Sequence, residues 1–212
     1  MLWRHKGLIL VLCLAGTGGI AAETPENMRA ALESVSERVV AAMLAGDPII
    51  EDAPARALLK TQPSRKGMFV SIFDKKTRRL RGCMGSLVAQ RANLYDEVTH
   101  WTTMALMHDT RTARPRKNAE YLVIISFVDH IEPVVNVYEI NAIQHGILVR
   151  QRGREELVLP GEAFTTAYAL KMISQKLQNS AEAEGSEYFR IHAERFGKAI
   201  ALFKKFDGGY GG

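Results

Sequence analysis

An unbroken apolar run constrains the fold of this chain more than any other segment. Residues Tyr121–Val128 read YLVIISFV, in which Ser126 is the only small polar residue. A strand with one face in water alternates apolar and polar residues, whereas a strand covered on both faces does not. We therefore predict that Tyr121–Val128 is an interior strand with structure packed against both of its faces.

Two pairs of shorter segments predict hairpins around this strand. Gly67–Asp74 is rich in β-forming residues, and Arg78–Gly85 returns after a polar turn. Gly146–Gln151 and Glu155–Pro160 flank a second polar turn and predict a second hairpin. We expect the first hairpin and the apolar strand to share one sheet.

Apolar residues recur at spacings of three and four elsewhere, which predicts amphipathic helices. Thr24 and Asn93 are the expected N-caps of two of them, because their side chains accept bonds from free N–H groups. The helical segments expected are 25–45, at most one turn within 55–60, 93–108, 162–178 and the tail from 187.

The order of these elements predicts the fold class. Helix, hairpin, helix, strand, hairpin and helix lack the regular alternation that builds a parallel sheet. We predict an α+β fold, a mixed β-sheet with flanking helices in a single two-lobed domain over residues 23–206, followed by a flexible tail at 207–212. The chain has 212 residues, 47% of them hydrophobic, which excludes disordered and collagen-like classes.

Residues 1–22 have the layout of a secretory signal peptide. Arg4 and Lys6 are followed by the apolar run Leu8–Ala15 and by small residues up to Ala22. The run is shorter than the ~20 residues that cross a bilayer. We predict cleavage near Ala22, an exported protein in the periplasm or the medium, and no transmembrane segment afterwards. The alternative is an uncleaved N-terminal anchor.

Cys83 is the only cysteine that remains once a leader containing Cys13 is removed. A single cysteine in an oxidising compartment cannot form an internal disulfide. It is therefore buried and inert, paired with a partner, or kept for chemistry.

The sequence around Cys83 is Leu80-Arg-Gly-Cys-Met-Gly85. On an extended strand Arg81, Cys83 and Gly85 share one face, and a guanidinium beside a thiol favours the reactive thiolate. Gly82 and Gly85 leave the backbone open to close approach. The alternative is that Cys83 is a small buried apolar residue and the glycines form a bulge or a tight strand crossing.

Leu80–Gly85 resembles the LRGCIG signature of the AMMECR-type domain family, named for a human chromosomal-deletion region. The resemblance covers about residues 30–180 and implies a mixed-sheet α+β fold, a site around the RGC motif and a Memo-type partner. Further segments that resemble the family, in its order, are Leu94-Tyr95-x-Glu97, Asp109-x-Arg111, Ser126, His145-Gly146 and Leu159-Pro160.

His145 is the natural companion of Cys83 if the site is catalytic. A His–Cys pair within hydrogen-bond reach gives an activated nucleophile near neutral pH. The alternative is a histidine that bonds its own turn. Asp109 and Arg111 would orient His145 or bind a substrate carboxylate, unless they form a structural salt bridge. The expected substrate-binding residues are Arg81, Gly82, Gly85, Asp109 and Arg111.

Motifs for other chemistry are missing from the sequence. There is no HExxH, no CxxC and no facial carboxylate set, so we predict neither a metal site nor a cofactor. The arginine-rich and lysine-rich segments lack interleaved aromatic residues, so we predict no specific nucleic-acid binding.

Two functions remain open at this stage. One is an exported enzyme that uses Cys83 and His145 on a small, acyl or amide substrate. The other is a non-catalytic module of the cell envelope that binds a small-molecule, peptide or protein ligand.

Overall fold

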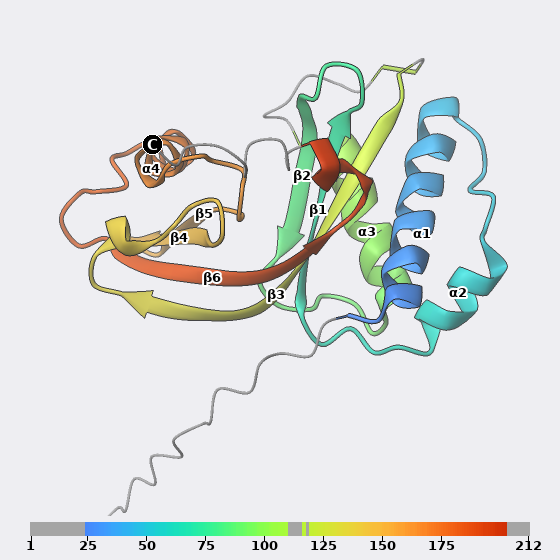
Figure 1. Ribbon diagram of the computed structural model, residues 1–212, viewed down its shortest axis with the longest axis horizontal. Helices are drawn as coiled ribbons and strands as arrows, with labels where there is room; N and C mark the ends of the chain where they lie inside the picture. The colour runs from blue at the N-terminus through green and yellow to red at the C-terminus, as the bar shows by residue number, and fades with distance from the viewer. Residues whose placement is uncertain (1–23, 110–115, 118, 203–212) are drawn as a thin grey trace, which may run out of the picture.

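The computed structural model describes residues 24–109, 116–117 and 119–202 (Figure 1). The predicted leader, Arg111 and the predicted tail at 207–212 lie outside the described residues. A curled six-stranded sheet and four α-helices make up an α+β fold, which confirms the predicted class.

The sheet has the order β2-β1-β3-β6-β4-β5. The strands are β1 (Gly67–Asp74), β2 (Leu80–Ser86), β3 (Tyr121–Val134), β4 (Gly146–Gln151), β5 (Arg154–Val158) and β6 (Glu187–Phe196). Both predicted hairpins form, as β1–β2 and β4–β5. The described pairings are all antiparallel rather than mixed, because no helix carries the chain between neighbouring parallel strands.

The predicted interior strand is confirmed. Residues 123–128 of β3 are buried, and the strand pairs with β1 on one side and β6 on the other. β3 continues to Val134, so the strand is longer than the apolar run. Its extension and the facing part of β6 bend into the second half of the sheet, which curls as a result (Figure 1).

The helices are α1 (Glu26–Ala45), α2 (Ala53–Lys60), α3 (Leu94–Met107) and α4 (Thr166–Leu177). Asn93 caps α3 as predicted, since its side chain accepts a bond from the backbone N–H of Asp96. Thr24 does not cap α1: Pro25 is at the N-cap, and the Thr24 hydroxyl donates to Glu194. α2 has 8 residues and exceeds the single turn predicted. Within the described residues, no helix has the length and apolarity that spanning a membrane requires.

The helix predicted for the tail from Glu187 is wrong. Residues 187–196 are strand β6, which lies between β3 and β4, and a short 3₁₀ turn, Lys198–Leu202, is the last element of the described residues. The apolar residues Phe189, Ile191 and Ala193 alternate along the strand and pack on one face of the sheet. A ten-residue segment with apolar residues on both faces fits both the helical and the strand periodicity. Its pairing with two neighbouring strands makes it a strand.

Different elements pack on the two faces of the β1–β2–β3 part of the sheet. α1 and α3 pack on the face that presents Met68, Val70 and Ile125. The opposite face presents Phe69, Cys83 and Val128, which pack with residues of β4, β5 and β6. This second face is the concave one, because the sheet curls over it.

Candidate functional site

A cleft of about 600 Å³ lies on the concave face between β2 and β5, the two edge strands of the curled sheet. This volume is in the range of small-molecule sites. α4 also contributes to the cleft, beside β5. Among the lining residues are Phe69, Cys83, Gly85, Asp109, Leu148, Glu155, Glu156, Leu157, Glu162, Met172 and Lys176. The lining therefore combines an apolar surface with several charged groups.

Cys83 is half-buried in this cleft and held from two sides. It lies opposite Ser71 in the β1–β2 register, and the Ser71 hydroxyl donates a hydrogen bond to Sγ over 3.2 Å. The backbone N–H of Cys83 donates to Oδ2 of Asp109 over 2.9 Å. Asp109, just past the end of α3, thus orients the strand at the thiol, and both residues line the cleft.

The two glycines beside Cys83 serve packing inside the protein. A Cβ atom at Gly82 would overlap the carbonyl oxygen of Ala105 in α3. A Cβ atom at Gly85 would overlap the carbonyl oxygen of Met68 and the ring of Phe69 on β1. The two glycines therefore allow β2 to lie close against α3 and β1. Of the two, only Gly85 lines the cleft.

Arg81 does not join Cys83 in the cleft lining. The β1–β2 register shifts between Ile72 and Phe73, so the strand alternation predicted for residues 81–85 is broken at Arg81. The Arg81 guanidinium lies 3.7 Å from a carboxylate oxygen of Asp74, which is almost fully buried.

His145 lies on the other face of the sheet from Cys83. Its ring is tilted against that of His192, with centroids 4.6 Å apart. On β6, His192 alternates with Ile191, which packs on the concave face with Phe69, so His192 and His145 point away from the cleft. The backbone N–H of His145 donates to Asn141 within its own turn. The structure does not bring the expected Cys83–His145 pair together.

Burial is the main influence on the acidity of His145, and the charge of Glu132 opposes it in part. Burial lowers the pKa of His145, and nearby His192 and Arg190 lower it further. The imidazole is therefore held toward its neutral form, although no thiol is its partner.

Arg195, Ser126 and Glu162 are polar residues of the concave side, and of these the sequence analysis named only Ser126. Arg195 on β6 lies opposite Ser126 on β3, which lies opposite Phe69 on β1, so these side chains share one face. Burial lowers the pKa of Arg195, while the charges of Glu162 and Cys83 raise it. Among the described residues, Arg195 Nε, Ser126 Oγ and Glu162 Oε1 are buried without a hydrogen-bond partner.

Glu97, in another segment that the sequence analysis singled out, has a structural role. Its buried carboxylate accepts bonds from the backbone N–H groups of Gln90 and Arg91 and from the indole of Trp101. These bonds fix the loop between β2 and α3, and Glu97 is not among the residues of the cleft.

Comparison with known proteins gives a family and a fold. A model of the AMMECR1 family matches residues 29–200. The crystal structure of an uncharacterised protein from Pyrococcus horikoshii is similar, with a TM-score of 0.63 and 17% sequence identity, over 78% of this chain and 89% of that one. No curated protein matches the chain.

Proposed function

The chain belongs to the AMMECR1 family, and on that premise we propose that it binds a small molecule in the cleft between β2 and β5 and attacks it with the Cys83 thiolate. The observation that carries this proposal is the position of Cys83: the residue lines a cleft of ligand size, and its sulfur accepts a bond from Ser71. The Ser71 hydroxyl donates to the sulfur, and the charge of the Arg195 guanidinium interacts with Cys83. Both groups favour the thiolate, which is the nucleophilic form of cysteine.

The groups around Cys83 suit an acyl or amide substrate. The thiolate adds to the carbonyl carbon, the bond to the amine or alcohol breaks, and the leaving group takes up a proton; water then hydrolyses the thioester. Glu162 lines the same cleft and has an unbonded carboxylate oxygen, so it replaces His145 as the group that exchanges protons with the ligand. Arg195 balances the negative charge that gathers near Cys83 and Glu162.

A non-catalytic ligand-binding protein is the second candidate. The apolar part of the lining, which includes Phe69, Leu148, Leu157 and Met172, favours it because such surfaces bind ligands without any reaction. In both cases the predicted leader at residues 1–22 supports export as part of the proposal.

Alkylation kinetics of Cys83 in two variants test the nucleophile. We expect Arg195→Gln and Ser71→Ala each to slow the reaction of native Cys83 with iodoacetamide at neutral pH by about tenfold, since each loses a group that favours the thiolate. Intact-mass spectrometry measures the rate. Arg152→Gln is the matched control, because Arg152 is an exposed arginine of the β4–β5 turn. Unchanged rates in both variants, with native thermal unfolding, would leave only the non-catalytic candidate.

A further inference from the structure

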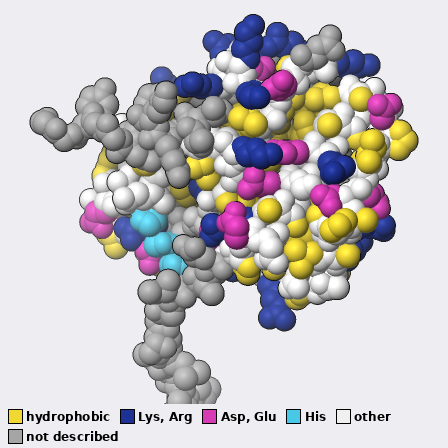
Figure 2. All heavy atoms as spheres, turned by 45° about the vertical axis from the view of Figure 1, so that its right-hand side comes forward, with side chains coloured by type: hydrophobic (Ala, Val, Ile, Leu, Met, Phe, Trp, Pro, Cys, Tyr) yellow, Lys and Arg dark blue, Asp and Glu magenta, His cyan; other side chains and the backbone are white. Residues whose placement is uncertain are grey.

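Three histidines lie close together on the face opposite the cleft, two of them on strands and one just before a strand. His130 on β3 lies directly across from His192 on β6, and His145 lies one residue before β4, beside the same strand. The His130 and His192 rings are stacked, with centroids 3.9 Å apart and planes 12° apart. Figure 2 shows histidine side chains gathered in one patch of the surface.

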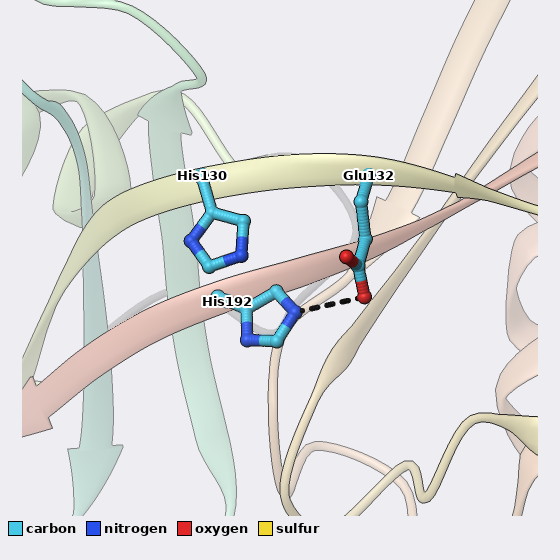
Figure 3. Close-up of side chains that lie close together, drawn as sticks. All are labelled: His130, Glu132 and His192. Atoms are coloured by element: carbon cyan, nitrogen blue, oxygen red, sulfur yellow. Dashed lines mark hydrogen bonds and ion pairs between the residues drawn. The ribbon is translucent and has the colours of Figure 1, made fainter. Parts of the chain in front are cut away.

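Glu132 completes this cluster with a carboxylate. It follows His130 by two residues on β3 and therefore points to the same face, next to both rings (Figure 3). Its Oε1 lies 3.1 Å from Nε2 of His192 and accepts a bond from Nη1 of Arg190 over 2.6 Å.

We propose that His130, Glu132 and His192 bind a divalent transition-metal ion with the preference of zinc. One nitrogen or oxygen from each residue lies within 4.8 Å of the others. Zinc–ligand bonds of about 2.0–2.2 Å place ligand atoms somewhat closer together, so small side-chain rotations close the set. Two imidazoles and one carboxylate are a zinc ligand set that leaves a position open for water or a further ligand.

The surroundings of the cluster suit an ion that arrives from solvent. His130 is exposed, and Glu132 and His192 are half-buried, so the site is accessible without any movement of the backbone. Arg190 bonds Oε1 of Glu132, and an ion at this site replaces the contact between Nε2 of His192 and Oε1, because a ligating nitrogen carries no proton. Arg190 then orients the carboxylate of Glu132, as groups that hydrogen-bond to metal ligands do.

The spacing of His130, Glu132 and His192 in the sequence does not match a metal-binding motif. His130 and Glu132 are close in sequence, but His192 follows about sixty residues later and is adjacent only through the β3–β6 register. The prediction of no metal site was based on motifs with short ligand spacing, and strand pairing creates this set instead.

Titration calorimetry with zinc chloride on the tag-free full chain tests the site. We expect one ion per chain, and affinity at least about tenfold weaker in His192→Ala and in His130→Ala. His108→Ala is the matched control, because His108 is an exposed histidine at the end of α3, and it should bind zinc like the wild type. Magnesium should not bind, since it prefers an all-oxygen set.

Two results would overturn the site: no zinc binding by the wild type at micromolar concentration, or wild-type affinity in both histidine variants. His130 is exposed, so its replacement by alanine or glutamine should leave the fold intact even if His192→Ala unfolds the protein. Circular dichroism of each variant establishes that a loss of binding is not a loss of structure.

Discussion

Replacing Gly82 by alanine should lower the free energy of unfolding by about 3 kcal/mol. The added methyl group would overlap the backbone carbonyl oxygen of Ala105 in the last turn of α3, and a helix backbone atom cannot turn aside as a flexible side chain can. β2 must then separate from α3, which displaces the strand that carries Cys83. The Gly82 prediction therefore concerns both the fold and the cleft.

Urea denaturation followed by circular dichroism measures the Gly82 effect. Cys83→Ala is the matched control, since it changes the next residue of β2 without adding an atom, and we expect it to cost about 1 kcal/mol or less. Equal denaturation midpoints for Gly82→Ala and the wild type would contradict the packing of β2 against α3.

Replacing Ile124 by aspartate should cost at least about 4 kcal/mol and can abolish folding. Ile124 has no exposed surface, and β3 pairs on both sides, so a carboxylate there is buried without a partner. Val135→Asp is the matched control: it places the same charge just past the end of β3, where Val135 is 100% exposed, and should change stability by less than about 0.5 kcal/mol.

Thermal unfolding of the two aspartate variants distinguishes the outcomes. A large drop in melting temperature for Ile124→Asp alone is expected. Similar melting temperatures for both variants would mean that β3 is not the interior strand of the sheet.

Local sequence signals predicted the parts of the fold that depend on neighbouring residues. The apolar run 121–128, the polar turns of the two hairpins and the Asn93 cap each act within a few residues, and each appears in the structure. The helix predicted for the tail was wrong because β6 owes its conformation to pairing with β3 and β4, which are distant in sequence. The position of β6 between β3 and β4 follows from this pairing, and the periodicity of its own residues does not indicate it.

The candidate site could be predicted from the sequence only in part. The glycines identified Cys83 as unusual, and the structure puts Cys83 and Asp109 at the same cleft. The pairing with His145 did not follow, because the face to which a residue points depends on the register of the curled sheet. For the same reason Arg195, Glu162 and Ser126 could not be assigned to the concave side before the strand order was known.

The curled sheet thus separates two clusters of reactive side chains. The thiol of Cys83 is on the concave face with Ser71. His130 and His192 are on the opposite face with Glu132. Variants of one cluster should leave the other unaffected, so zinc binding and thiol reactivity are independent measurements. Failure of the zinc site would not weaken the proposal for Cys83.

The rate of Cys83 alkylation in the native protein tests the central claim most directly. Iodoacetamide at pH 6 to 7 is added to the folded chain and to a cysteine-containing peptide, and intact mass follows both reactions. If Cys83 is a thiolate nucleophile in an open cleft, the native protein reacts about tenfold faster than the peptide, or more. A Cys83 thiol that stays unmodified until the protein is denatured would contradict the account and identify Cys83 as a structural residue.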